Sequence, residues 1–406
     1  MCFVTVPHPL GMISKEEVNA KVDAAFDDIV KAATAWTPSK EKQDAQVKPY
    51  PAKRFKFSGT YADVNDMFQK RKWSLSLPIV PPTVDKVAAM LKGTKRNPAE
   101  VLWVVPPRQG MLTVELVAAL GVMAGAKPEH MPLLIATVEA MADPVAAWRG
   151  PTTTTAATVP VFFISGPIID KQKLNPGTGT AGGENPVTNA LGYFVNLVGD
   201  VVGGSVPPNF DKSTHGSSAD LVAMVFTENA KENPWKTTYA EEAGFKPSDS
   251  IVTHFSAYLG NANIDHDSKT GQRLLTTLST GLLGSASGLA SCLADYDATY
   301  AINNKVSFAF IVLCPEHAAT IAKDFPDQRA ARDFMRETAA MPYKFYSQET
   351  CVPGKDFGPY DENTFIPRFK KTESIKFFVS GGPGKQSQIW VPFPQVFKPV
   401  SKKIAE

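Results

Sequence analysis

Several features are scarce or missing in this sequence of 406 residues, and each absence excludes a class of protein. Only 4 cysteines occur, without a Cys-x-x-Cys pair, which excludes a disulfide framework and a structural zinc site and predicts reduced thiols in the cytoplasm. No apolar run approaches the roughly 18 residues that a membrane-spanning helix needs. The 42 Lys and Arg residues nearly balance the 40 Asp and Glu residues, and no basic stripe is interleaved with aromatic residues, so no nucleic-acid partner is expected.

What the sequence does contain is a repeated succession of apolar strand, polar loop and helix. Strands are predicted at residues 101–105, 159–165, 221–227, 251–255, 306–313 and 375–379. Helical segments follow most of the loops that end these strands. The pattern predicts an α/β fold in which layered mixed sheets are flanked by helices and functional loops lie at the carboxyl ends of the strands. No internal repeat is evident in the sequence.

The composition also divides the chain into segments. Residues 1–35 predict a short strand, a turn and a helix that begins at the capping box Ser14-Lys15-Glu16-Glu17. They begin without a basic segment before an apolar block, so no signal peptide is expected. Residues 36–55 are polar and interrupted by prolines, as is typical of a linker. Residues 56–406 are predicted to form the main α/β domain, with a division into two lobes near residue 205 as an alternative.

Polar side chains gather around one predicted strand end between residues 203 and 250. Glu228 and Asn229 directly follow the strand, His215 precedes it and Trp235 follows. Burial would raise the pKa of Glu228 and make it a candidate general base, and His215 suits proton transfer near neutral pH. The alternatives are that Glu228 caps a turn or pairs with a lysine, and that His215 is an ordinary surface histidine. Asn229 and Trp235 are candidates for substrate binding.

Three further places can carry chemistry. His8 lies between two prolines that aim its ring, which makes it a third catalytic candidate or a structural histidine of the turn. Arg108 follows two prolines at a strand end and can bind a carboxylate, or alternatively form an internal ion pair. The turn after residue 379 offers backbone N–H groups for an anion, with a tight hairpin as the alternative. The candidate binding residues of this turn are Gly382, Lys385 and Ser387.

No metal site is predicted, because the histidines show no ligand spacing such as His-x-x-x-His. The alternative is a metal-dependent lyase or hydrolase that uses His254, His266 and the acids beside His266. Cys314 ends a predicted core strand and is interpreted as a buried, inert thiol. His317 lies in the first turn of the next helix and is interpreted as structural.

Two parts of the chain resemble known bacterial proteins. Residues 3–35, with Pro7-His8-Pro9-Leu10-Gly11, resemble the carboxyl-terminal end of proteins that carry a Sec/Cys-Gly-Ser-Cys motif and of the selenoprotein B subunits of glycine and betaine reductases. Residues 61–390 resemble a poorly characterised α/β family that occurs beside or fused to that domain. The segments that carry this second resemblance are LPIVPPT (77–83), VVPPRQGMLTVE (104–115), NPVTNALGYFVNLVGDVVGG (185–204), THG (214–216), FTEN (226–229) and FVSGGPGKQS (378–387). The chain departs from the family at Asn189–Tyr193, where relatives have an arginine-bearing helix start.

The resemblance implies a subunit of a thiol- or selenol-dependent enzyme complex, of reductase or lyase type, that acts on a small anionic molecule. It also implies a partner chain with a Cys-Gly-Ser-Cys type motif that supplies the reactive Cys or Sec. The cofactor stays open, and one alternative is that this chain binds none. The alternative is a non-catalytic partner subunit of a redox protein. In the enzyme hypothesis Glu228, His215 and Arg108 are expected to meet in one pocket.

Overall fold

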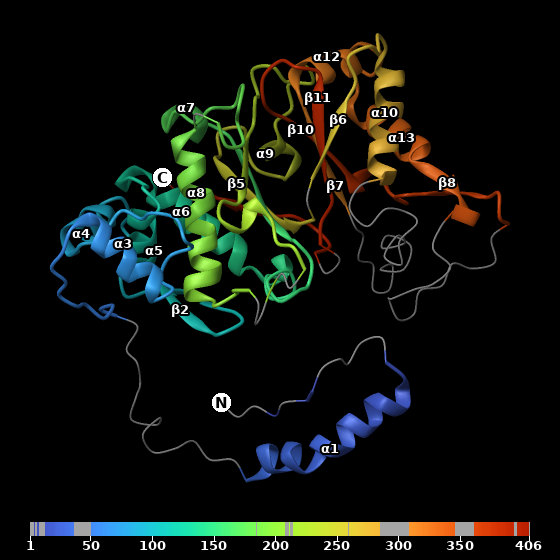
Figure 1. Ribbon diagram of the computed structural model, residues 1–406. Helices are drawn as coiled ribbons and strands as arrows, with labels where there is room; N and C mark the ends of the chain where they lie inside the picture. Colours follow the sequence, from blue (N-terminus) through green and yellow to red (C-terminus); the bar gives the residue numbers. More distant parts are fainter. Residues whose placement is uncertain are drawn as a thin grey trace. The chain divides into compact units, whose positions relative to one another are not determined.

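The computed structural model describes residues 4, 6–7, 13–35, 50–183, 185–207, 211, 214–258, 260–284, 308–345, 361–393 and 396–405 (Figure 1). The chain divides into two units, Met1–Lys48 and Pro49–Glu406. The smaller unit holds helix α1 (Lys15–Thr34). Its predicted capping box is confirmed, because Ser14 Oγ accepts from the Glu17 N–H and Glu17 Oε2 accepts from the Ser14 N–H. Among the described residues, no helix is both long and apolar enough to cross a membrane.

The larger unit contains two four-stranded sheets, which confirms the predicted α/β fold with mixed sheets. The first sheet has the strand order β12-β5-β3-β4, and the second has the order β10-β7-β11-β6. Each sheet has one parallel pair, β3 with β4 and β7 with β10, and its other pairs are antiparallel. The strands are β3 (Val159–Ser165), β4 (Met224–Thr227), β5 (Ile251–Ala257), β6 (Asn261–Ile264), β7 (Ala309–Leu313), β10 (Ile375–Val379), β11 (Gln386–Trp390) and β12 (Val400–Lys403).

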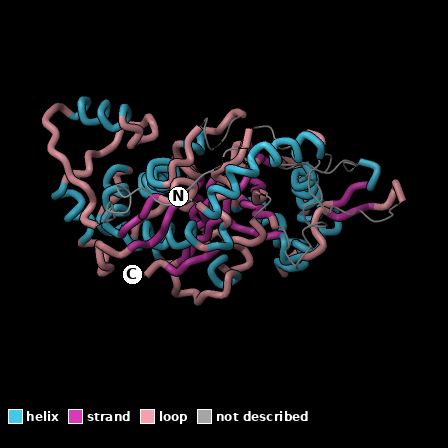
Figure 2. Tube along the Cα trace, turned by 90° about the horizontal axis from the view of Figure 1, so that it is seen from below, coloured by secondary structure: helices cyan, strands magenta, loops and turns pink. Residues whose placement is uncertain are grey.

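Helices cover the outer face of each sheet, and the inner faces pack against each other. Helices on the first sheet are α5 (Val114–Met123), α6 (Met131–Ala142) and α8 (Pro186–Asn196), and helices on the second are α10 (Gly271–Gly284), α12 (Pro315–Asp324) and α13 (Gln328–Thr338). Figure 1 shows the two groups on opposite sides of the strands, and Figure 2 shows most strands lying between helices. An aromatic core fills the space between the sheets, where the rings of Phe163 and Phe310 stack with centroids 4.4 Å apart. Burial on both faces explains why the central strands are apolar throughout.

The two sheets repeat one topology, although the sequence shows no repeat. In each half a strand is followed by helices, then by a parallel strand, and then by an antiparallel strand that pairs with the first. The next strand crosses to the other half: β6 follows β5 but pairs with β11, while β12 follows β11 but pairs with β5. Each half therefore completes the sheet of the other. A boundary near residue 205 would fall between β3 and β4, which pair directly.

Backbone hydrogen bonds at the strand ends show the equivalence residue by residue. The Glu228 N–H donates to the Ile164 carbonyl at 2.9 Å, and in the other half the Ser380 N–H donates to the Leu313 carbonyl at 3.0 Å. Glu228 and Ser380 then pair with each other in an isolated antiparallel bridge. The carboxyl ends of the two parallel pairs therefore meet at one place.

The exchanged strands end in equivalent hydrogen bonds as well. The Ile404 N–H, directly after β12, donates to the Ser250 carbonyl at 2.8 Å. The Asp265 N–H, directly after β6, donates to the Lys385 carbonyl at 3.3 Å. Ser250 and Lys385 each immediately precede the antiparallel strand of their own half, so the two crossings follow the same geometry.

The remaining elements lie around this framework, and one of them corrects a prediction. The predicted strand at residues 101–105 forms β1 (Val101–Val105), but it lies outside the two layered sheets, in a two-stranded hairpin with β2 (Gly110–Thr113), and Val101 and Val104 are 42% and 43% exposed. Val104 pairs with Met111, which is 39% exposed, so this part of the hairpin stays open to solvent. The other elements include α3 (Tyr61–Lys70), α4 (Val84–Leu91), α7 (Ile168–Lys171), α9 (Tyr239–Glu242), β8 (Ala340–Pro342) and β9 (Phe365–Pro367).

Candidate functional site

Glu228 lies where the two halves meet. It directly follows β4, as predicted, and it is only 2% exposed. The Tyr239 N–H, at the start of α9, donates to Glu228 Oε1 at 2.7 Å. Glu228 Oε2 is buried and has no hydrogen-bond partner in the described part of the chain. One carboxyl oxygen is therefore held in place, and the other is available for a different partner.

The environment of Glu228 favours its protonated form. Burial raises the pKa of Glu228 to about 7, and the negative charges of Glu241 and Glu242 act in the same direction. The Tyr239 N–H and the nearby Ser165 hydroxyl offset part of this rise in pKa. A carboxyl group with a pKa near 7 exchanges its proton readily at neutral pH, which is what general acid–base catalysis needs.

Residues from both halves close around this carboxyl group. The Asn229 N–H donates to the Val379 carbonyl at 2.8 Å, and Asn229 Nδ2 donates to the Gly381 carbonyl at 3.1 Å. Ser380 Oγ donates to the Thr227 carbonyl at 2.7 Å. The Asn229 side chain thus ties the end of β4 to the end of β10. Its predicted role in substrate binding stays a prediction, because the amide already holds the backbone together.

The glycine-rich loop before α8 covers the turn after β10. The Gly381 N–H donates to the Pro176 carbonyl at 2.8 Å. Gly382 lies against Thr178 so closely that a Cβ atom would come within 2.2 Å of Thr178 Oγ1. A side chain at residue 382 would displace the loop, so this position requires glycine for packing as well as for any binding role.

Several buried polar atoms at these strand ends lack hydrogen-bond partners among the described residues. They are Ser165 Oγ, Asn185 Oδ1, Thr227 Oγ1 and Glu228 Oε2. Ser165 ends β3, and the chain next to it carries the Glu228 carboxyl group. Buried polar groups ordinarily have partners, and the Ser165 hydroxyl lies near enough to Glu228 to lower the pKa of the carboxyl group, so these two side chains act on each other.

His215 and Arg108 lie elsewhere, so the expectation that they share a pocket with Glu228 is wrong. Thr214, next to His215, donates to the Thr155 carbonyl through its N–H and its hydroxyl, before the start of β3. The Arg108 N–H donates to the Gly203 carbonyl. Two residues after Gly203, Ser205 Oγ donates to the Thr152 carbonyl, which lies before the start of β3. Glu228 lies at the other end of β3 and β4. The seven residues of β3 separate the two ends by about 20 Å.

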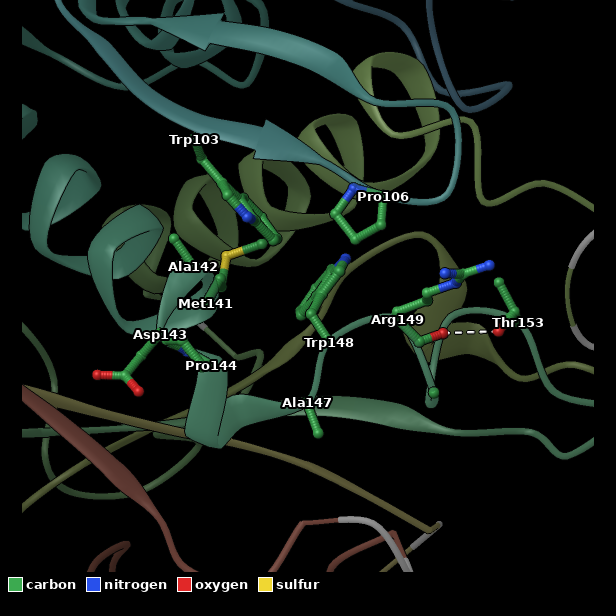
Figure 3. Close-up of a pocket in the computed structure, with 11 residues that line it drawn as sticks. Trp103, Pro106, Met141, Ala142, Asp143, Pro144, Ala147, Trp148, Arg149 and Thr153 are labelled. Atoms are coloured by element: carbon green, nitrogen blue, oxygen red, sulfur yellow. Dashed lines mark hydrogen bonds between the residues drawn. The ribbon is translucent and has the colours of Figure 1, made fainter. Parts of the chain in front are cut away.

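A cavity of about 520 Å³ lies at the end of the first sheet that Arg108 and His215 share (Figure 3). The indole rings of Trp103 and Trp148 meet edge to face in its wall, with centroids 5.7 Å apart. Figure 3 shows Asp143 and Arg149 on opposite sides of Trp148, and Asp143 forms an ion pair with Lys402 at 2.7 Å. None of the predicted site residues, Glu228 included, lines this cavity.

The other predicted binding residues belong to the second half or pack against it. Trp235 packs on Phe377 and donates from Nε1 to the Phe325 carbonyl at 3.0 Å, so its indole is part of the packing outside the second sheet. Lys385 Nζ donates to the His266 carbonyl at 3.0 Å. Ser387 contacts the start of α12. These side chains therefore do not surround Glu228 as one group.

The turn after β10 does bind an anionic group, but the group belongs to the chain itself. The N–H groups of Gly384 and Lys385 donate to Glu316 Oε2 at 2.6 and 2.9 Å. These hydrogen bonds hold the pKa of Glu316 below its ordinary value. The predicted anion cradle thus has the expected chemistry and an internal occupant.

The histidine predictions have different outcomes. His8 lies outside the described residues. His254 is fully buried, stacks on Phe162 with centroids 4.5 Å apart, and keeps a pKa lowered by burial to about 3, so its ring is neutral. His266 is exposed and follows a strand of the other sheet. The described ranges contain no group of three or more His, Cys, Asp or Glu side chains that could hold a metal ion.

The sequence interpretation missed one cluster, formed by Cys314, His317 and Ser387. Both Cys314 and His317 were interpreted as structural, yet His317 Nδ1 lies 2.8 Å from Ser387 Oγ, and the Cys314 N–H donates to the same oxygen at 3.3 Å. The signal was the order Cys-Pro-Glu-His at the junction of a strand and a helix.

Comparison of this chain with protein-family models, curated proteins and solved structures found no match.

Proposed function

We propose that this chain is a catalytic subunit of a thiol- or selenol-dependent enzyme of reductase or lyase type, in which Glu228 moves a proton to or from a small molecule. The observation that carries the proposal is the buried carboxyl group at the junction of the two halves. One of its oxygens is held by the Tyr239 N–H, the other has no partner among the described residues, and its pKa lies near 7. Protonated Glu228 can donate a hydrogen bond to an anionic oxygen, which suits a small anionic substrate.

The thiol or selenol dependence comes from the resemblance of residues 3–35 and 61–390 and not from Glu228. In this proposal a partner chain with a Cys-Gly-Ser-Cys type motif supplies a redox-active Cys or Sec, and the complex works in the cytoplasm without a cofactor bound to this chain. His215 and Arg108 take no part in the step at Glu228, because they lie at the far end of the first sheet.

A non-catalytic role as partner subunit is the second candidate, and helix α1 favours it. Its apolar side chains Val22, Phe26, Ile29 and Val30 are 40–57% exposed, and most other residues of the helix are polar or alanine. An amphipathic helix of this kind commonly buries its apolar face against another surface.

The experiment separates the two roles. Partner chains are identified by co-purification and mass spectrometry, and consumption of small carboxylates and amines by the purified complex is followed by mass spectrometry. Glu228→Gln is expected to abolish turnover while the complex still assembles, because the amide cannot exchange a proton. The matched control is Glu232→Gln, an exposed residue four positions away, which is expected to keep full turnover. Loss of assembly in Glu228→Gln with unchanged activity per assembled complex would instead support the non-catalytic role.

A further inference from the structure

We propose that the cavity between strand β1 and the segment after α6 is a binding site for a small aromatic carboxylate. Its volume of about 520 Å³ lies within the range of about 300–1,000 Å³ that is usual for small-molecule sites. Glu228 is not among its lining residues. The inference therefore goes beyond the proposed function and does not depend on the chemistry at Glu228.

Two separate segments of the chain form the walls of the cavity. Trp103 and Pro106 come from β1 and the turn after it, and residues 141–150 come from the end of α6 and the segment that follows. The chain turns at Ala147, which lies in the left-handed region with φ 49° and ψ 34°. The next two residues, Trp148 and Arg149, both reach the cavity (Figure 3). An aromatic ring and a guanidinium group therefore lie side by side in one wall.

The two tryptophans give the cavity a rigid aromatic corner. Trp103 is half-buried, and its ring meets that of Trp148 edge to face with centroids 5.7 Å apart. Trp148 is only 4% exposed and rests on the buried ring of His254, with centroids 5.6 Å apart. Aromatic rings attract each other in edge-to-face and offset-stacked arrangements. A flat aromatic ligand can contact Trp103 in either way while the core keeps Trp148 in place.

Beside this aromatic corner lie donors that have no acceptor. Trp148 Nε1 is buried and has no hydrogen-bond partner in the part of the chain that the structure describes. Figure 3 shows this nitrogen directed toward Pro106, on the side of the ring where Arg149 lies and away from Asp143. The exposed guanidinium of Arg149 pairs with none of the described residues. Both groups can only donate, and a carboxylate offers two acceptor oxygens that match a guanidinium in a bidentate pair.

The only carboxylate among the lining residues is already neutralised. Lys402 Nζ donates to Asp143 Oδ2 at 2.7 Å, and the Val145 N–H donates to Asp143 Oδ1 at 3.0 Å. These contacts, with Lys402 first, hold the pKa of Asp143 below its ordinary value. A cationic ligand would have to compete with Lys402 for this carboxylate, whereas an anionic ligand meets Arg149 without displacing a described side chain. The charges of the cavity therefore favour an anion.

The test is isothermal titration calorimetry of the full chain with 2-naphthoate as the probe. We expect one saturable site per chain with a Kd below about 1 mM, because the probe combines a flat ring with a carboxylate. The neutral 2-naphthamide has nearly the same shape and is expected to bind about two- to fivefold more weakly, the effect of one exposed ion pair. The cation 2-naphthylmethylammonium should bind most weakly. Absence of saturable binding of 2-naphthoate overturns the proposal, and so does equal or tighter binding of the amide or the cation.

One pair of variants tests the role of the guanidinium. Arg149→Gln is expected to remove the difference in Kd between 2-naphthoate and 2-naphthamide, because only the carboxylate uses the positive charge. The matched control is Arg273→Gln, at an exposed arginine of α10, which should keep the difference. If Arg149→Gln still prefers the carboxylate to the same extent, the anion binds at another place and the proposal fails.

A second pair of variants tests the aromatic wall. Trp103→Leu is expected to weaken both ligands by about tenfold, while Trp73→Leu, at a half-buried tryptophan that does not line the cavity, should leave both Kd values unchanged. An unchanged Kd in a folded Trp103→Leu variant overturns the proposal. If Trp103→Leu does not fold, the surface variant Arg149→Gln decides. Because binding is measured and not turnover, this proposal and the proposal for Glu228 can fail separately.

Discussion

The two halves of the larger unit share a backbone plan and differ in the chemistry placed on it. At the first strand end, Ser165 closes β3 and Glu228 follows β4. At the equivalent places of the second half, Cys314 follows β7 and Ser380 follows β10. One half thus carries a carboxyl group with a raised pKa, and the other carries a thiol with a lowered pKa beside an imidazole. The comparison teaches that backbone pairing decides where a functional group lies, while the side chain alone decides which chemistry appears there.

The exchange of strands adds a second lesson. Because β6 and β12 each pair with the other half, neither half has its complete sheet by itself. The aromatic core between the sheets is likewise built from both halves. The sites at the strand ends therefore rest on contacts that only the whole unit makes, and the following variants test this dependence from the largest expected effect to the smallest.

Phe163→Ala is expected to have the largest effect. The Phe163 ring is fully buried and stacks on Phe310 of the other half, so truncation leaves a cavity between the sheets. We expect the free energy of unfolding to fall by about 3–5 kcal/mol, measured by urea denaturation. The matched control is Phe365→Ala, where the ring is 65% exposed and the loss should stay within about 0.5 kcal/mol. Similar losses in both variants would mean that the shared core does not hold the halves together.

Glu228→Gln is expected to change how stability depends on pH. The pKa of Glu228 is about 7 in the folded state and about 4.5 in the unfolded state, so between these values the unfolded state binds fewer protons. Stability therefore falls as pH rises from 4.5 to 7, and the penalty is fully present above pH 7. Urea denaturation at pH 8 should show Glu228→Gln to be more stable than the unsubstituted protein by about 3 kcal/mol, with little difference at pH 4.5. Equal shifts at both pH values would contradict a raised pKa.

His254→Ile compares equivalent strand positions of the two halves, because the second half has Ile389 where the first has His254. Burial lowers the pKa of His254 from about 6.5 to about 3, so the unfolded state binds more protons between these values. The unsubstituted protein should lose stability as pH falls below 6.5. At pH 5 we expect the substitution to remove a penalty of about 2 kcal/mol, measured as the pH slope of urea denaturation. If the pH slope is the same in the variant, His254 does not cause the loss of stability at low pH.

Glu316→Gln should have the smallest and most local effect. The neutral amide is a weaker acceptor for the Gly384 and Lys385 N–H groups than the carboxylate is. Hydrogen exchange at these two amides should become faster, while exchange in β10 stays unchanged. If the two amides keep their protection, the turn is held by contacts other than Glu316.

Much of the local structure could be predicted because its causes lie within a few residues. The Ser14–Glu17 capping box follows from adjacent side chains, and it is present. The apolar run at residues 159–165 became β3 with the predicted limits. The position of Glu228 after a strand could also be predicted, because the strand ends where the apolar run ends.

Which of the site residues lie together in the fold could not be predicted from the sequence. His215 and Glu228 are 13 positions apart in the chain, and β4 between them carries them to opposite ends of the first sheet. Cys314 and Ser387 are far apart in the chain, yet they lie side by side because β7 pairs with β11. A short segment cannot reveal which distant strand will lie next to it.

The sequence by itself determined the elements of this protein: where helices begin, where apolar strands end, and which polar side chains follow them. Only the tertiary structure decided the exchange of β6 and β12, the bridge between Glu228 and Ser380, and the pairing of Cys314 with His317 and Ser387. The physical reason is the separation along the chain over which each kind of interaction acts. Capping and periodicity act over one or two turns of chain, whereas strand pairing and the pKa shifts that burial causes depend on segments brought together from the whole unit.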